Sequence, residues 1–125
     1  MNTVIYPSKR SYIRYDDNHF LLYLNEEVIE DYLPEDAEEG VEPATVYSYT
    51  GSSTDGGTLI SAKVDTYEAF VSGLVRSRYS SDQVEAIILN LQSNDPERID
   101  EFRQEMDDLN NWRAECKQIA ADLLL

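Results

Sequence analysis

Hydrophobic and polar residues follow two different periods along the chain, and the change falls near its middle. Over residues 1–64, short runs of β-branched and aromatic residues alternate with turn-forming residues, which is typical of strands. Over residues 65–125, apolar residues recur every three or four positions, which is typical of amphipathic helices. Strands followed by helices predict an α+β fold, and the length of 125 residues indicates a single domain.

A β-hairpin is predicted near the N-terminus. The runs SYIRYD, residues 11–16, and HFLLYL, residues 19–24, are rich in residues that favour strands. Asp17 and Asn18 separate them, and both residue types tolerate the positive φ of a tight turn. We therefore expect two antiparallel strands joined at this point.

Residues 26–33 are predicted to form a short helix. Asn25 is a suitable N-cap and Pro34 would end the helix. The apolar residues that recur at helical spacing are Val28, Ile29, Tyr32 and Leu33. Residues 34–44 then form an acidic loop.

Two further strands, residues 46–50 and 58–64, are predicted to pair around the glycine-rich loop at residues 51–57. A phosphate-binding P-loop needs a lysine after its last glycine and a helix after that. Here Gly57 is followed by Thr58 and a strand-like run. The loop is therefore expected to turn the chain, with Gly56 and Gly57 supplying the positive φ of a wide hairpin turn.

The second half is predicted to hold two to three helices, including a helical hairpin with a long closing helix. Asp65 or Thr66 caps a first helix that runs to about Tyr79, and Ser80 with Gln83 forms a capping box for the next. Asp95 is the expected N-cap of the closing helix, residues 96–123. Residues 107–111 are poor helix formers, so the sequence leaves its continuity open.

The closing helix carries a heptad-like apolar series. Such a series either packs inside a helical layer or forms a seam for self-association. The members of the series are Ile99, Phe102, Met106, Leu109, Cys116, Ala120 and Leu123.

Candidate catalytic groups are few. His19 is the only histidine and is expected at a hairpin turn, and Cys116 is the only cysteine, on the apolar side of a helix. Burial there would raise the pKa of the thiol and make it unreactive. No carboxylates flank His19 at the spacing of metal ligands. We expect a protein that is not an enzyme, with no catalytic, cofactor-binding or metal-binding residues and no cofactor.

Charge is distributed unevenly along the chain. The net charge is −15, which disfavours direct binding to nucleic acid. Residues 25–42 contain nine acids and no base, whereas residues 1–15 contain three bases and no acid. The acidic segment is a solvated loop, a docking segment or a mimic of nucleic acid. Together the two segments also permit head-to-tail contacts between copies of the chain.

Tyrosine is unusually frequent, with nine residues against three phenylalanines. Tyrosine combines a large apolar surface with a polar tip, which favours protein interfaces, although such rings also cover the edges of small sheets. The candidate interaction residues of the N-terminal region and the closing helix are Tyr6, Tyr12, Tyr15, Tyr23, Phe102, Met106 and Trp112.

Three stretches between residues 47 and 123 share short patterns with one group of proteins. They are YTGSSTDGGTLISA, TYEAFVSGLVRSRYSSDQVEAIILN and EFRQEM…WRAECKQIAADLL. As a set they resemble small accessory proteins encoded near tail or tail-fibre genes of phages and prophages of gut bacteria. The residues that carry the resemblance are Tyr79-Ser80, Glu85-Ala86-Ile87, Trp112-Arg113 and Cys116-Lys117. The resemblance implies a virion component or tail-assembly factor that binds other proteins, and it carries over no active site.

The expected function is therefore a non-enzymatic protein-interaction module, a phage structural or tail-assembly accessory protein. Its partners would be copies of itself or phage structural proteins, with no direct contact to nucleic acid or membrane. The alternative is an acidic inhibitor that mimics nucleic acid and blocks a host nuclease. The N-terminus has no signal-peptide pattern and no run approaches a bilayer span, which favours the bacterial host cytoplasm or the virion.

Overall fold

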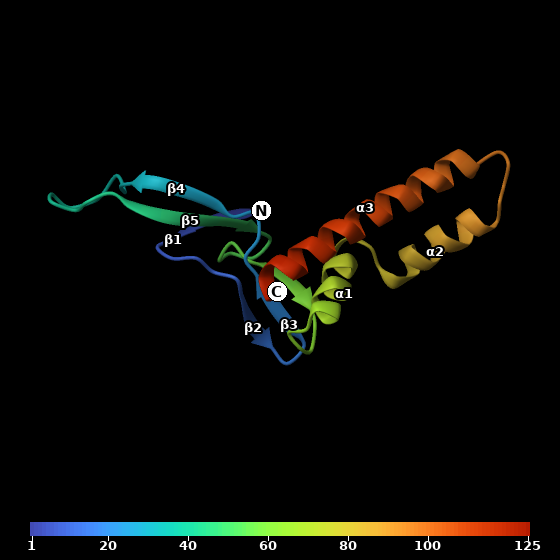
Figure 1. Cartoon of the computed structure of the whole chain (residues 1–125), viewed down its shortest axis with the longest axis horizontal. Helices are drawn as coiled ribbons and strands as arrows, with labels where there is room; N and C mark the ends of the chain where they lie inside the picture. Colours follow the sequence, from blue (N-terminus) through green and yellow to red (C-terminus); the bar gives the residue numbers. More distant parts are fainter. The chain divides into compact units, whose positions relative to one another are not determined.

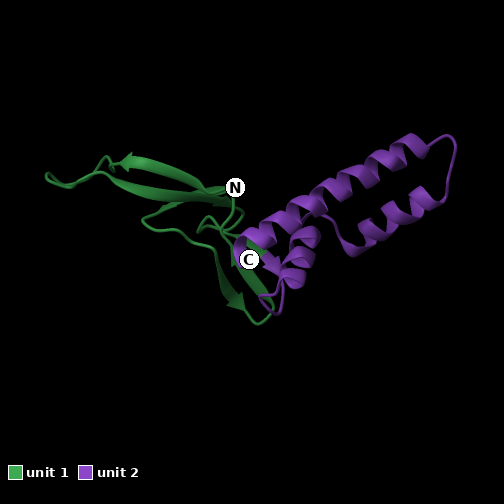
Figure 2. Ribbon diagram, viewed as in Figure 1, with its two compact units in different colours: residues 1–59 green, residues 60–125 purple.

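A computed structural model describes the whole chain, residues 1–125, with six strands followed by three helices (Figure 1). This order confirms the α+β class. The chain divides into two compact units, residues 1–59 and residues 60–125, which are called unit 1 and unit 2 below (Figure 2).

The larger part of unit 1 is a three-stranded antiparallel sheet in the order β1-β5-β4. Its strands are β1 (Asn2–Tyr6), β4 (Glu27–Tyr32) and β5 (Ala44–Gly51). The central strand β5 carries buried Val46, Ser48 and Tyr49, so it forms the middle of this layer.

The helix predicted over residues 26–33 is wrong, because this segment is the edge strand β4. Ile29 lies opposite Val46 in the antiparallel register, and β-branched side chains fit a pleated surface better than a helix. Asn25, the expected N-cap, instead takes a φ of 55° and donates from its side-chain amide to the Thr50 carbonyl at 3.1 Å. Asp31 has a φ of 53° where the ladder is irregular.

The N-terminal hairpin is confirmed as β2 (Tyr12–Asp16) and β3 (His19–Leu22), which pair antiparallel around Asp17 and Asn18. These strands belong to a second sheet in the order β2-β3-β6, where β6 is Thr58–Ser61. The predicted pairing of strands 46–50 and 58–64 is therefore wrong. Both strands exist, but β5 already has β1 and β4 on its two edges and has no free edge for β6.

The glycine-rich loop between β5 and β6 is a compact turn. Gly56 has the expected positive φ of 84°, whereas Gly57 does not have a positive φ, so that expectation is wrong. At Gly57 a side chain would fit tightly, since a Cβ would lie 3.0 Å from the Asp55 carboxylate and 3.3 Å from the Leu21 side chain.

Unit 2 contains α1 (Tyr67–Arg78), α2 (Ser81–Gln92) and α3 (Ile99–Leu124). The caps of α1 and α2 are confirmed. The Thr66 hydroxyl accepts from the Ala69 amide at 3.3 Å. Ser80 and Gln83 exchange side-chain to backbone hydrogen bonds of 2.7 and 3.1 Å.

The closing helix begins three residues later than predicted. The Asp95 carboxylate accepts from the Glu97 amide in a turn, Arg98 takes the cap position, and no side chain caps the helix. From Ile99 the helix continues through residues 107–111 without interruption. Four members of the apolar series are buried, namely Phe102, Leu109, Cys116 and Ala120.

Gly73 lets α1 approach β6 within unit 2. A Cβ at this position would lie 2.7 Å from the Ser61 carbonyl oxygen and 3.1 Å from the Ile60 side chain. Both α1 and α2 pack against α3, and Figure 1 shows α2 beside the N-terminal half of α3 and α1 beside its C-terminal half.

Candidate interaction surfaces

Three tyrosines of unit 1 form a cluster. The ring centroids of Tyr6 and Tyr23 are 5.9 Å apart and those of Tyr23 and Tyr49 are 5.7 Å apart, both edge to face. Aromatic pairs in this geometry add to the stability gained by burial. Tyr23 and Tyr49 are 3% and 1% exposed, so this tyrosine cluster is part of the core of unit 1.

The hydroxyl groups of the tyrosine cluster all have partners within unit 1. Tyr23 donates to the Asp55 carboxylate at 2.7 Å, and Tyr6 donates to the Asp55 carbonyl oxygen. Tyr49 donates to the Glu26 carboxylate at 2.7 Å and accepts from the Arg10 amide at 2.8 Å. The polar tips that would suit an interface are therefore used inside the fold.

The surroundings of the tyrosine cluster shift the pKa values of its members and of Asp55. Burial, and then the hydrogen bond to Asp55, raise the pKa of Tyr23 to about 12. Burial also raises the pKa of Tyr49. For Asp55, burial alone would raise the pKa, but hydrogen bonds led by that from Tyr23 outweigh it and hold the pKa below its usual value. The folded state thus keeps Tyr23 neutral and Asp55 charged.

Three backbone amides of the glycine-rich loop also have partners within the chain. Gly57 donates to the Asp55 carboxylate at 2.9 Å, Ser53 donates to the Gly57 carbonyl at 2.9 Å, and Gly56 donates to the Ser53 carbonyl at 3.1 Å. Because a phosphate cradle needs such amides free, this arrangement is that of a turn.

The three bases near the N-terminus are engaged inside unit 1. The Lys9 ammonium lies 3.7 Å from the Glu26 carboxylate. The Arg10 guanidinium lies 4.4 Å from the ring centroids of both Tyr6 and Tyr23, a double cation–π contact. The third, Arg14, lies 4.5 Å from the Phe20 ring centroid. A head-to-tail contact between copies would have to compete with these contacts, and it stays a prediction.

The acidic loop after β4 presents its carboxylates to solvent. The exposed acids of this loop are Glu35, Asp36, Glu38, Glu39 and Glu42. They are available to a basic partner, as the docking and mimicry hypotheses both require.

The candidate interaction residues differ in their access to a partner. In unit 1, Tyr23 is buried, Tyr6 and Tyr12 are half-buried, and Tyr15 is 60% exposed.

In unit 2, Phe102 is buried, and Met106 and Trp112 are half-buried. The Arg78 guanidinium covers the Trp112 ring at 3.6 Å from its centroid, and the indole Nε1 is buried without a hydrogen-bond partner. Tyr23 and Phe102 therefore serve the two cores, because large aromatic rings are the most effective apolar groups to bury.

The surroundings of His19 and Cys116, the two candidate catalytic groups, are those of residues with a structural role. His19 lies beside Asp16, with Nδ1 2.8 Å from a carboxylate oxygen, at the hairpin turn of unit 1. Cys116 is fully buried in unit 2, and burial raises the pKa of its thiol to about 11. No group of three or more histidine, cysteine or acidic side chains is placed to hold a metal ion.

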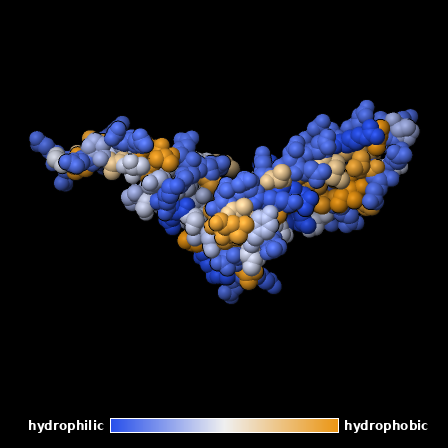
Figure 3. Space-filling model, in the orientation of Figure 1, coloured by the Kyte–Doolittle hydropathy of each residue, from blue (hydrophilic) through white to orange (hydrophobic).

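The most exposed aliphatic side chains of the helices lie on α2. This helix contains Val84, Ile87, Ile88, Leu89 and Leu91, and Ile87 is the only one that is buried. Ile88 is 40% exposed and Leu89 is 53% exposed. Figure 3 shows hydrophobic residues gathered over α2. Leu89 follows Ile87 by two positions, so it lies on a different face of α2 from that buried residue.

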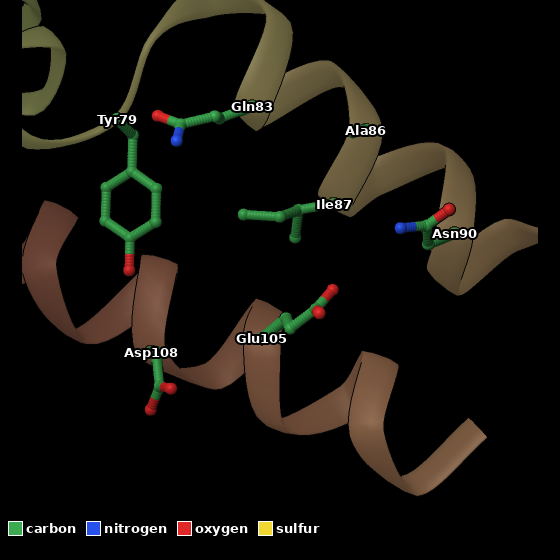
Figure 4. A pocket seen from close by; sticks show the side chains of 7 residues that line it. All are labelled: Tyr79, Gln83, Ala86, Ile87, Asn90, Glu105 and Asp108. Carbon is green, nitrogen blue, oxygen red and sulfur yellow. The ribbon is translucent and has the colours of Figure 1, made fainter. Parts of the chain in front are cut away.

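A groove with a volume of about 320 Å³ lies between α2 and α3 (Figure 4), and neither Ile88 nor Leu89 lines it. Ile87 points between the two helices and forms its apolar floor, and Tyr79 lies at one end. Glu105 and Asp108 of α3 line the opposite wall. We call this feature the α2–α3 groove. Figure 4 shows the Glu105 carboxylate turned toward α2, whereas the Asp108 carboxylate, which accepts from Gln104 at 2.8 Å, is turned away from it.

None of the three helices combines the length and hydropathy of a membrane-spanning helix. No protein-family model, no curated protein and no solved structure matches this chain.

Proposed function

We propose that this protein is a non-enzymatic interaction protein that presents α2 and the α2–α3 groove to a protein partner. The observation that carries the proposal is the exposure of α2, where Ile88 and Leu89 stay uncovered and a groove of about 320 Å³ opens on another side of the same helix. Side chains of this size normally contribute about 1.5–3 kcal/mol each when they are buried. A partner that covers them would gain this stabilisation.

The helical context supports this proposal. In globular proteins, the stability of a short helix comes mainly from packing its apolar face against neighbours. The helix α2 has 12 residues, and Ile87 is its only buried one. The capping box at Ser80 and Gln83 fixes the start of the helix without help from a partner. The uncovered surface is therefore held ready rather than formed on binding.

The surroundings of the reactive groups support a role without catalysis. A nucleophile needs an adjacent base and access to substrate. Cys116 is fully buried with a raised pKa, and His19 is paired with Asp16 at a turn.

The finer proposal is a phage structural or tail-assembly accessory protein, located in the bacterial host cytoplasm or the virion. It rests on the resemblance described above. Of the residues that carry it, Tyr79, Ala86 and Ile87 line the α2–α3 groove. Proteins of this kind act by contact with other subunits, which agrees with an uncovered helix surface.

The second candidate function is an acidic inhibitor that mimics nucleic acid. The exposed carboxylates of residues 35–42 and the net charge of −15 favour it. Mimicry depends on these charges and not on Ile88 or Leu89. Replacing the acids of residues 35–42 by their amides would abolish inhibition of a nuclease and would leave binding through α2 intact.

The test is co-expression of the chain with each structural protein encoded beside its gene, followed by light scattering at low and high salt. We expect a complex of defined mass that the double variant Ile88→Ser/Leu89→Ser no longer forms. The matched control is Ile13→Ser/Val64→Ser, whose side chains are 41% and 51% exposed outside α2. A chain that forms no complex with any of these proteins, or a complex equally sensitive to both double variants, would contradict the proposal.

A further inference from the structure

We propose that the free edge of β1 pairs with β1 of a second copy of the chain. The two strands run antiparallel across a two-fold axis, so that the β1-β5-β4 sheets of both copies join into one continuous sheet. This surface is separate from α2, and the inference does not depend on the proposed function. It follows from the direction of the backbone groups of β1, the lack of protection along this edge and the position of the acidic residues.

The backbone of β1 presents two residues to its free edge. The Thr50 amide donates to the Leu24 carbonyl at 3.2 Å, and the Thr50 carbonyl accepts from the Asn25 side chain at 3.1 Å, so both groups face the β4 side of β5. Thr3 lies opposite Thr50, which makes this a pair without hydrogen bonds between β1 and β5. The N–H and C=O groups of Thr3, and of Ile5 two positions later, therefore point away from β5.

The outward backbone groups of Thr3 and Ile5 are open to another strand. β1 is the end strand in the order β1-β5-β4, and Figure 1 shows it at the border of that sheet. No hydrogen bond of a turn, loop or side chain uses the backbone of either residue. The side chain of Thr3 is exposed, and Ile5 is 41% exposed.

Two other edge strands, β4 and β2, carry features that discourage pairing. An exposed edge strand is a template for association, and proteins block it with charges, proline or a bulge. β4 contains three acids, and its register with β5 shifts between Ile29 and Tyr32. β2 contains Arg14 and Asp16, and its register with β3 shifts between them.

The edge strand β1 has none of these features. Its sequence, NTVIY, contains no charged residue and no proline, and its three central residues are β-branched. It pairs with β5 in an unbroken register, from Asn2 opposite Gly51 to Tyr6 opposite Tyr47. A contact that uses this same edge in both copies closes on itself and does not extend into a fibre.

The outward groups of β1 are complementary to those of a second β1. With Val4 on the two-fold axis, Thr3 of each copy lies opposite Ile5 of the other. Each of these pairs exchanges two N–H···O bonds, so every outward N–H and C=O of Thr3 and Ile5 is used. An axis at Thr3 or Ile5 would pair only one of these residues within β1, so the axis at Val4 is the favoured one.

The negative charge of the chain does not lie at this contact. The acidic segment of residues 25–42 belongs to β4 and its flanking loops, and β4 lies on the far side of β5 from β1. Neighbouring strands are about 4.8 Å apart, so the two β4 strands of the joined sheet would be about 24 Å apart. Charges at the surface are largely screened beyond about 8–10 Å at physiological salt.

The dimer is expected to be weak and reversible. A contact confined to one strand edge belongs to the small interfaces below about 1,200 Å². The protein should therefore be monomeric when dilute and dimeric when concentrated. Added salt should leave the dimer unchanged or strengthen it, because salt screens the net charge of −15 on each copy. A head-to-tail contact between charged segments would weaken instead.

The first experiment measures the mass of the full chain by sedimentation equilibrium over a range of concentrations, at low and high salt. Ile5→Lys should weaken dimerisation by about tenfold or more, because the two lysines would lie on one face of the joined strands. The matched control is Val28→Lys, which adds the same charge at a 52% exposed position of the other edge strand, β4. Val28→Lys and Ile88→Ser/Leu89→Ser should both leave dimerisation unchanged.

A second experiment tests the register by disulfide formation. Two Val4 residues related by the axis would have Cα atoms about 4.5 Å apart, within the range of a disulfide, so mild oxidation should join two chains of Val4→Cys. Two Ile5 residues would have Cα atoms about 8 Å apart, so Ile5→Cys should not form this bond. The native Cys116 does not compete, because it is fully buried.

Three outcomes would overturn the inference and leave the proposed function standing, because α2 takes no part in this contact. The first is a monomer at every concentration up to that of an NMR sample. The second is a dimer that Ile5→Lys and Val28→Lys weaken equally, or that cross-links as readily through Ile5→Cys as through Val4→Cys. The third is a dimer that dissociates when salt is added, which would support the head-to-tail contact in its place.

Discussion

Both units leave aliphatic side chains in solvent, such as Val28 of unit 1, but the tyrosine cluster of unit 1 and the helix α2 of unit 2 treat polar and apolar groups differently. In unit 1, Tyr23 and Tyr49 are almost fully enclosed, and their hydroxyls are bonded to Asp55 and Glu26. In unit 2, Leu89 is 53% exposed although it is aliphatic. The difference shows that the partners available to a side chain decide its burial as much as its polarity does.

The buried polar groups of unit 1 form one connected set. Asp55 joins Tyr23, Tyr6 and the Gly57 amide, and Arg10 stacks on two of the tyrosine rings. Such a set fixes a unique arrangement when every member has a partner. The exposed apolar groups of unit 2 have the opposite character, since they contribute little until something covers them.

The largest expected effect is on the close contact of α1 with β6 in unit 2. Gly73→Val would place side-chain atoms against the Ser61 carbonyl oxygen, where a Cβ alone already lies at 2.7 Å. Since backbone cannot move aside cheaply, we expect a loss of about 3 kcal/mol or more in unfolding free energy. Chemical denaturation followed by Trp112 fluorescence reports this loss, because Trp112 is the only tryptophan and lies in unit 2.

Ser72→Ala is the matched control for this variant, since Ser72 is the exposed neighbour in the same helix. It should change the unfolding free energy by less than about 0.5 kcal/mol. Equal stability of Gly73→Val and Ser72→Ala would show that α1 does not depend on the close approach.

The next effect is the loss of stability of unit 1 at alkaline pH. The pKa of Tyr23 rises from an ordinary value near 10 to about 12 in the folded state. A raised pKa stabilises the fold fully below pH 10, and the stabilisation is lost as the pH rises from 10 to 12. The difference corresponds to about 2–3 kcal/mol. Thermal unfolding between pH 8 and pH 12 measures it.

Tyr23→Phe isolates this contribution, because the buried Cys116 thiol and Tyr49 also have raised pKa values and add their own losses. The variant should lose less stability than the wild type between pH 10 and pH 12. Parallel curves for the two proteins would mean that Tyr23 is not held neutral by the fold.

At neutral pH the same variant should have a smaller effect. Tyr23→Phe removes the hydroxyl that donates to Asp55 at 2.7 Å, and it keeps the ring in its packing. Asp55 is half-buried, and a lost hydrogen bond to such a charged group costs about 1–2 kcal/mol. The control is Tyr15→Phe on the 60% exposed Tyr15, which we expect to be neutral. Urea denaturation of both variants distinguishes a structural tyrosine from a surface one.

Local signals in the sequence predicted the elements that depend on local physics. The hairpin at Asp17-Asn18, the cap at Thr66 and the capping box at Ser80 involve residues within a few positions of each other. The strand β4 was mistaken for a helix because its spacing fits both structures. Its pairing with β5, which puts Ile29 opposite Val46, decided the outcome, and a contact over that sequence separation leaves no local signal.

The candidate surfaces were predicted less well for a related reason. Tyrosine composition indicated contact area, but it could not show that the Asp55 and Glu26 carboxylates would meet the hydroxyls of Tyr23 and Tyr49. The apolar period of α2 indicated a buried face, but the number of neighbours that cover it depends on where α1 and α3 lie. Burial depends on the folded structure of the whole chain, so polarity alone could not predict which of these residues are buried.

The smallest expected effect on stability is that of replacing the exposed aliphatic residues of α2. Ile88→Ser/Leu89→Ser should change the unfolding free energy of the isolated chain by about 1 kcal/mol, because the two side chains are 40% and 53% exposed and lose only partial burial. Ile87→Ser, by contrast, removes the one buried residue of α2 and should cost about 2 kcal/mol or more. Urea denaturation followed by helical circular dichroism compares the two.

A large loss of unfolding free energy in Ile88→Ser/Leu89→Ser would mean that α2 needs these two residues to fold. Their presence on the surface would then be explained without a binding partner. A small loss, together with the loss of complex formation, leaves binding as the reason for two aliphatic residues on this surface. This combination of results is informative, because variants that destabilise the fold usually weaken binding as well. Ile88 and Leu89 of unit 2 would then stabilise a contact between two molecules, whereas the tyrosines of unit 1 stabilise contacts within one molecule.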